Sequence, residues 1–223
     1  MKISLPQNWD GITVNQLQEL YPIMTASGDL VERAYSRIAV LSGEPLDDIR
    51  KIKFKDIKIL SKQLEFLNEF NTLKFKDRHF FIDGQRYHWD GDFNNMDFDQ
   101  YTTFMDVLRE CKNTNGVVDD NLIIQNLHRL LACVVIKDIK KGKRWIEGEF
   151  DGGLFQSHAR ICRYDLPSSI GHPIGVFFCN YFQRSIQSIA DYGSNQLTKA
   201  EKVIKEVEQD LQQYGAGTSP LTT

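Results

Sequence analysis

Carboxylate and amide side chains in the run Asp90-Gly91-Asp92-Phe93-Asn94 are spaced like the first, third and fifth ligands of a calcium-binding loop. The residues that follow depart from that pattern. Asn95 stands where the sharp turn of such a loop requires glycine, and Tyr101 stands where a bidentate glutamate would complete the coordination. We therefore predict a capped polar loop here and no calcium site.

His158 and Cys162 form the other pair with metal-ligand spacing, because residues four apart share one face of a helix. A zinc site would need two more ligands from distant segments. The remaining histidines lie among apolar or turn residues, where hydrogen-bonded structural roles are usual; they are His79, His88, His128 and His172. We predict no metal and no cofactor.

Motifs of the common enzyme classes are missing from the sequence. It contains no glycine-rich phosphate loop ending in Gly-Lys-Ser or Gly-Lys-Thr, no Gly-x-Ser-x-Gly turn and no His-Glu-x-x-His helix. We predict that the protein is not an enzyme and has no catalytic residues. The alternative is an enzyme whose acid and base groups are brought together only by folding, because such a site leaves no linear signature.

A basic run with an aromatic neighbour lies between residues 137 and 145. Its members are Lys137, Lys140, Lys141, Lys143, Arg144 and Trp145. Such a run can contact phosphates and stack a base, so a nucleic-acid-binding module is one alternative function. The whole chain has 27 basic and 30 acidic residues and a net charge of -3, which favours a solvated loop or a rim that contacts protein. The lysines between residues 51 and 62 are predicted to form a solvated helix face.

The cysteines and the hydropathy indicate a cytoplasmic protein. Cys111, Cys133, Cys162 and Cys179 are widely separated, which matches neither a metal motif nor a dense disulfide framework, so we predict reduced thiols in the core. No segment approaches the roughly 18 apolar residues that a membrane span requires. We predict a soluble protein without a membrane partner.

Apolar residues recur at helical intervals along most of the chain. The capping-box pattern Thr13-Val14-Asn15-Gln16 predicts a helix that starts at Val14. Further helices are predicted over residues 29–41, 46–52, 56–70, from 97 until about 113, and over 122–136, 154–163, 174–192 and 196–214. The helix over 122–136 is apolar around more than half of its circumference, which predicts a central and buried position.

Two aromatic-rich runs on either side of Asp83-Gly84 predict a β-hairpin over residues 79–89, with a type I′ turn. Leu73 to Phe75 is expected as a third strand. The charged, glycine-rich residues 137–153 are expected to form an exposed loop or a small hairpin. The predicted fold class is therefore α+β and mainly helical, with a small central β-hairpin at about residues 73–90 and a long C-terminal helix.

The predicted domain organisation is a helix-rich core over residues 1–192, followed by a C-terminal helix and flexible tail over 193–223. The last helix carries an apolar stripe at alternating spacings of three and four, formed by Leu197, Ala200, Ile204, Val207 and Leu211. This stripe either packs on its own domain or meets another subunit.

Several strings in the chain resemble a group of tailed-bacteriophage proteins from phages of the Bacteroides type, including crAss-like phages, and also resemble tail assembly chaperones. The resemblance spans roughly residues 8–190 and rests on layout and short strings. These are residues 8–17 (NWDGITVNQL), 64–67 (LEFL), 81–87 (FIDGQRY), 96–101 (MDFDQY), 126–132 (NLHRLLA) and the helix with Phe177-Phe178.

The resemblance implies a non-enzymatic bacteriophage morphogenesis protein that binds other phage proteins in the host bacterial cytoplasm. A tail assembly chaperone would hold the tape-measure protein soluble through exposed apolar faces. The alternative is a virion component, as a ring, connector or tail subunit that forms a homo-oligomer or contacts tail or portal-proximal proteins. The residues predicted to contact such partners are Trp9, Trp145, Leu197, Ile204, Val207 and Leu211.

Overall fold

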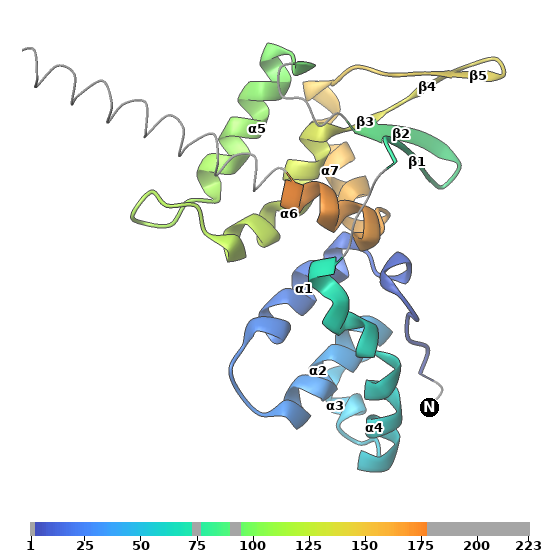
Figure 1. The fold of residues 1–223 in the computed structure, drawn as a ribbon, viewed down its shortest axis with the longest axis vertical. Helices are drawn as coiled ribbons and strands as arrows, with labels where there is room; N and C mark the ends of the chain where they lie inside the picture. The colour runs from blue at the N-terminus through green and yellow to red at the C-terminus, as the bar shows by residue number, and fades with distance from the viewer. Residues whose placement is uncertain (1–2, 73–76, 90–94, 178–223) are drawn as a thin grey trace, which may run out of the picture. The chain divides into compact units, whose positions relative to one another are not determined.

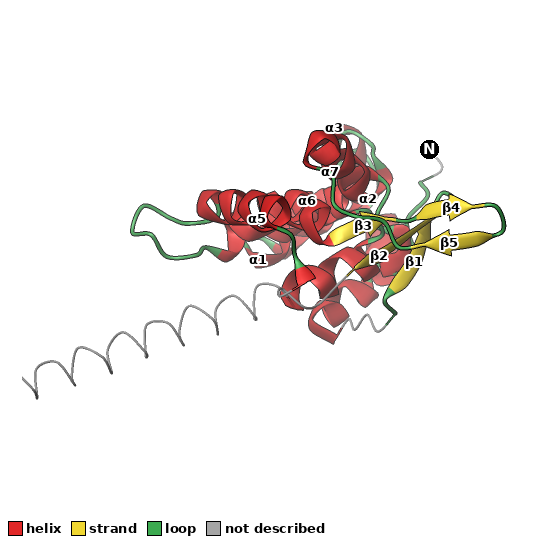
Figure 2. Ribbon diagram, turned by 90° about the horizontal axis from the view of Figure 1, so that it is seen from above, coloured by secondary structure: helices red, strands yellow, loops and turns green. Residues whose placement is uncertain are grey.

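The computed structural model describes residues 3–72, 77–89 and 95–177, with only the backbone described at 69–72. The helices are α1 (Val14–Thr25), α2 (Leu30–Ser42), α3 (Leu46–Ile49), α4 (Phe54–Gln63), α5 (Phe98–Glu110), α6 (Asp120–Val134), α7 (Phe155–Tyr164) and a last one over 168–177 (Figure 1). Short 3-10 helices span Trp9–Gly11, Glu65–Thr72 and Gly152–Leu154. The strands are β1 (His79–Ile82), β2 (Gln85–Trp89), β3 (Val135–Lys137), β4 (Ile139–Lys141) and β5 (Arg144–Ile146), shown in yellow in Figure 2. The mainly helical α+β prediction is confirmed.

All described residues belong to one compact unit, residues 1–178. The predicted domain boundary at 192–193 and the predicted C-terminal helix lie outside the described residues, and so do residues 90–94 of the calcium-like run. None of the described helices has both the length and the hydropathy needed to cross a membrane.

Short polar side chains start the helices where the sequence predicts. Thr13 accepts the amide N–H of Gln16, and the Gln16 side chain accepts the amide N–H of Thr13 at 3.1 Å, which completes the capping box of α1. The side chains of Asp29, Asp97 and Asp119 accept backbone amides at the starts of α2, α5 and α6, without the reciprocal bond of α1. These caps satisfy amides that have no partner inside a helix.

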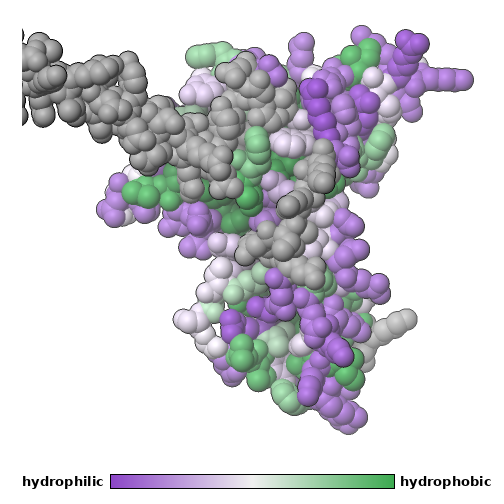
Figure 3. Space-filling model, viewed as in Figure 1, coloured by the Kyte–Doolittle hydropathy of each residue, from purple (hydrophilic) through white to green (hydrophobic). Residues whose placement is uncertain are grey.

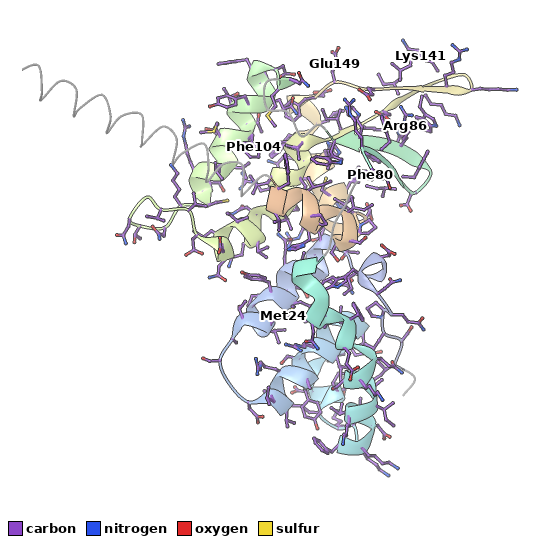
Figure 4. All side chains as sticks on the ribbon, viewed as in Figure 1. Met24, Phe80, Arg86, Phe104, Lys141 and Glu149 are labelled. Carbon is purple, nitrogen blue, oxygen red and sulfur yellow. The ribbon has the colours of Figure 1, made fainter. Side chains whose placement is uncertain are left out.

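The centre of the helical core is α6, which packs against α1, α5 and α7. Its side chains Leu127, Leu130 and Leu131 are buried, and Phe104 of α5, labelled in Figure 4, is 1 % exposed. The predicted central position of this helix is confirmed. Burial of this apolar surface is the main favourable contribution to folding.

The helix over 168–177 begins earlier than predicted. Ser168 donates its amide N–H to the Ile12 carbonyl at 2.7 Å, which ties the start of this helix to the segment before α1. Gly171 and Gly175 then bring its backbone close to Val14 and Leu127. The predicted helix over 174–192 is therefore correct for its first residues, wrong in its start, and outside the described residues beyond 177.

The β1–β2 hairpin forms as predicted, with positive φ angles of 48° at Asp83 and 76° at Gly84, as a type I′ turn requires. Its third strand is β3, which pairs antiparallel with β2. The predicted helix over 122–136 is thus too long, because the β-branched Val135 and Ile136 leave it to pair with β2 and remain buried. The expected third strand at Leu73–Phe75 lies outside the described residues.

The predicted helix over 56–70 is interrupted. α4 ends at Gln63, and a 3-10 helix follows over Glu65–Thr72. Leu64 and Leu67 are both buried at this break, and the indole N–H of Trp9 donates to the Phe66 carbonyl at 3.2 Å. Periodicity alone could not detect the break, because both halves keep an apolar stripe.

Candidate functional site

Strands β4 and β5 form a separate two-stranded ribbon, defined here as residues 139–146. Ile139 pairs with Ile146, Lys140 with Trp145, and Lys141 with Arg144. Gly142 has a φ of 62° and Lys143 does not have a positive φ, which fits a type II′ turn with glycine first. The small hairpin expected in residues 137–153 is confirmed, and Figure 1 shows it extending away from the helices.

The ribbon has two chemically different faces, because directly paired residues point to the same side of a two-stranded sheet. Its outer face carries Ile139 and Ile146, which are 53 % and 44 % exposed, together with Lys141 and Arg144. Figure 3 shows hydrophobic side chains interrupting the hydrophilic ones over the ribbon. The outer face therefore combines an exposed apolar pair with a basic pair.

Trp145 holds the inner face of the ribbon against β1 and β2. Its ring meets the Phe81 ring edge-on with centroids 6.0 Å apart, and the Arg86 guanidinium carbon lies 5.9 Å from its centroid. The Lys140 ammonium nitrogen lies 5.4 Å from the same centroid. These distances suit cation–π interactions. The half-buried Trp145 thus packs the ribbon against the three-stranded sheet, a structural role that the sequence did not predict.

Asp138 ties the start of the ribbon to β2. Its amide N–H donates to the Arg86 carbonyl at 2.9 Å, and its own carbonyl accepts from Gln85 Nε2 at 2.6 Å. Its fully buried carboxylate accepts from Arg86 Nε and lies 2.6 Å from His88 Nδ1. The chain leaves the sheet at this residue, so the carboxylate fixes the point of departure. Figure 4 places Arg86 at this base and Lys141 farther out on the ribbon.

Glu147 and Gly148 tie the end of the ribbon to the sheet. The Glu147 carboxylate accepts from Arg78 Nη2 at 3.0 Å and lies 2.9 Å from His79 Nε2. A Cβ atom on Gly148 would lie 2.1 Å from the Lys137 carbonyl oxygen, so only glycine permits this close approach of two backbones. The ribbon is thus anchored at both ends, by side chains at β1 and β2 and by the backbone of β3.

A hollow of about 470 Å³ lies at the base of the ribbon, lined by residues that include His88, Gln100, Glu147 and Glu149. A histidine backed by a carboxylate is an arrangement that can activate a nucleophile. None of the described residues around this hollow is serine, threonine or cysteine. The contacts of His88 and Asp138 instead hold β2 and the ribbon together.

The histidines predicted to be structural are packed or hydrogen-bonded. His128 Nδ1 lies 3.0 Å from Gln18 Nε2, and His158 stacks on Tyr87 with ring centroids 5.8 Å apart. Burial lowers the pKa of His128, His158 and His172 to about 4. The positive charges of Arg163 and Arg129 lower the pKa of His128 further, and the charge of Lys137 lowers that of His158 further. These rings are therefore neutral at pH 7.

No metal cluster accompanies His158 and Cys162: within the described ranges, no three histidine, cysteine, aspartate or glutamate side chains lie together as metal ligands. Burial also raises the pKa of the Cys162 thiol, which disfavours the thiolate that binds metal.

The residues predicted to contact partners fall in different places. Trp9 is only 5 % exposed and packs edge-on against Phe66, with centroids 5.7 Å apart, so the exposure assumed for it is wrong. It lies before the cap of α1, and its indole N–H donates to the Phe66 carbonyl. Trp145 lies in the ribbon. The other four, Leu197, Ile204, Val207 and Leu211, lie outside the described residues.

The anchoring residues Asp138, Glu147 and Gly148 were missed by the sequence reasoning. The signal that could have found them is an acidic residue between two short alternating β-like runs, and a glycine between two glutamates after the second run. The lysines at 53, 55, 58 and 62 are exposed, which confirms the predicted solvated face.

Comparison with known proteins gives no match: no family model, no curated protein and no solved structure matches the chain.

Proposed function

We propose that the protein acts by binding other proteins during the assembly of a tailed bacteriophage, without catalysis. The observation that carries the proposal is the ribbon, an anchored two-stranded element whose outer face presents the Ile139–Ile146 pair. An isolated two-stranded ribbon is only marginally stable in water. This ribbon is held by the buried Asp138 carboxylate and the packed Trp145 ring, which favours a function that requires an extended ribbon.

The chemistry of the ribbon suits a protein partner. In the described part of the chain β4 and β5 pair only with each other, so each presents an outer edge of backbone N–H and C=O groups. An extended segment of a partner can add to such an edge, while an apolar side chain packs on Ile139 and Ile146. The basic residues Lys141 and Arg144 favour acidic residues around that contact.

The resemblance to tailed-phage proteins supports the setting. In the first version of the proposal the chain is a tail assembly chaperone that binds the tape-measure protein in the host cytoplasm. In the alternative version it is a ring, connector or tail subunit that contacts identical or portal-proximal neighbours in the virion.

The test is affinity capture from phage-infected cells with a tagged full chain, followed by mass spectrometry of the captured proteins and of purified virions. The double variant Ile139→Ser/Ile146→Ser should lose the captured phage assembly proteins. A matched control, Ile59→Ser on α4, replaces an isoleucine that is 60 % exposed and should retain them. Detection of the chain in infected cells but not in purified virions would favour the chaperone. Detection of many copies per virion would favour the structural subunit. Capture unchanged by the double variant would contradict the role of the ribbon.

A nucleic-acid-binding function is the second candidate, favoured by the four basic residues of the ribbon. Lys140, Lys141, Lys143 and Arg144 make no ion pair with described residues. Against it, the Trp145 ring is already in contact with Phe81, Arg86 and Lys140, which leaves less of its surface for stacking a base. Retention on duplex or single-stranded DNA that falls steeply with salt, and that Lys141→Gln/Arg144→Gln abolishes, would favour this candidate.

A further inference from the structure

Two arginines of α2, Arg33 and Arg37, lie one helical turn apart and line a groove beside residues 61–68. The groove has a volume of about 110 Å³. Leu30, Ala34 and Leu64 supply apolar walls, and Ser61, Glu65 and Asn68 supply polar ones. None of these residues belongs to the ribbon, so this groove is a separate feature of the molecule.

Each guanidinium group in this groove has a buried Nε donor without an acceptor among the described residues. Arg33 donates from Nη1 to the Ala26 carbonyl at 3.1 Å, whereas Arg37 forms no hydrogen bond or ion pair with a described residue. A buried donor without an acceptor costs free energy. The groove is therefore incomplete in the chain alone.

The nearby carboxylates do not satisfy these arginines. Glu32 of α2 pairs with Arg50. Glu65 lines the groove but forms no ion pair with Arg33 or Arg37 among the described contacts. Burial lowers the pKa of Arg37, and the neighbouring charge of Arg33 lowers it further. With Arg33, Arg37 and Glu65 in its lining, the groove carries a net positive charge.

We propose that this groove binds a glutamate or aspartate side chain, next to an apolar residue, that a partner protein presents. A groove of about 110 Å³ suits a small group such as one carboxylate side chain. Guanidinium groups bind carboxylates through paired hydrogen bonds, and the Ser61 hydroxyl and Asn68 amide offer further donors. The rim residue Leu30 is 73 % exposed and offers a contact for the adjacent apolar side chain.

The test is an NMR titration of the full, isotope-labelled chain with the dipeptide acetyl-Glu-Leu-amide, observing the arginine Nε–H signals and the α2 backbone amides. The signals of Arg33 and Arg37 should shift saturably. The uncharged acetyl-Gln-Leu-amide should produce at least tenfold weaker binding, because it lacks the charge that the two guanidinium groups attract. The same titration with inorganic phosphate and with a short oligothymidylate, at matched ionic strength, tests the other anions.

Variants locate the site. Arg37→Gln should weaken binding of acetyl-Glu-Leu-amide at least tenfold, while Arg160→Gln, which changes an exposed arginine of α7, should leave it unchanged. Equal binding of the glutamine and glutamate dipeptides would overturn the proposal, as would the absence of a saturable shift. Tighter binding of phosphate or of the oligonucleotide would also overturn it, by showing a general anion site. None of these outcomes depends on whether the ribbon binds its partner.

Discussion

Asp138 and His88 are joined by a 2.6 Å contact between Oδ1 and Nδ1, and both side chains are buried, at 0 % and 5 % exposure. The same carboxylate also accepts from Arg86 Nε. All three residues lie where the ribbon leaves the three-stranded sheet. Burying a carboxylate costs desolvation free energy, so we infer that the role of Asp138 is to fix the geometry at the base of the ribbon.

Asp138→Asn should destabilise the fold by about 3 kcal/mol, because it removes the buried charge and leaves Arg86 without its carboxylate partner. The measurement is urea denaturation at pH 7. The control Asp106→Asn breaks an exposed ion pair, in which the Asp106 side chain is 68 % exposed and the Arg109 side chain 70 %. It should change the free energy of unfolding by less than about 1 kcal/mol. Similar small losses for both variants would mean that Asp138 does not anchor the ribbon.

Gly148→Ala should destabilise the protein by at least about 2 kcal/mol, since the new methyl group would meet the Lys137 carbonyl oxygen at 2.1 Å and one of the two backbones must move. The movement should also raise hydrogen exchange at the β4 and β5 amides. The matched control is Gly152→Ala, where the nearest atom would be Phe150 Cε1 at an ordinary 3.7 Å. If the two alanine variants unfold at the same urea concentration, the close approach at Gly148 is not present in solution.

The sequence predicts those elements whose signals are local. Thr13 caps α1 as predicted, because a cap needs only the next three residues. Asp83-Gly84 defines its turn for the same reason. The boundaries at Gln63 and Val134 were missed because distant partners decide them: Trp9 accompanies the first break, and β2 pairs with the strand after the second.

The candidate site was predicted only in part. The basic run and Trp145 pointed to the segment that forms the ribbon. Trp9 was assigned to the surface because an aromatic residue before a helix cap gives no local sign of burial. Asp138 and Glu147 act through contacts with Arg86, His88, Arg78 and His79, which lie fifty or more positions earlier in the sequence. No periodicity connects residues at that separation.

Cys111, Cys133 and Cys162 should resist alkylation in the folded protein. All three are buried free thiols, and burial raises the pKa of Cys111 to about 11 and that of Cys133 to about 12. Reaction with iodoacetamide at pH 8, followed by peptide mass spectrometry, should be slower than in urea by about a thousandfold or more, because access requires unfolding. Rapid labelling of any of the three in the native protein would contradict the predicted core position of that thiol.

Stability should decrease in mild acid because three buried histidines are neutral in the folded protein. The folded pKa of His128, His158 and His172 is about 4, against 6.5 without burial, so the unfolded chain binds more protons between these two values. The unfolding free energy is therefore fully retained above pH 6.5 and falls as the pH drops toward 4, by at most about 1.4 kcal/mol per pH unit for each ring. Urea denaturation at fixed ionic strength from pH 7 to 4.5 measures the slope of the unfolding free energy against pH.

His158→Phe keeps an aromatic ring on Tyr87 and removes one proton-binding site, so it should reduce this slope by the contribution of one ring. A slope equal to that of the unchanged chain would show that His158 is not held neutral by burial.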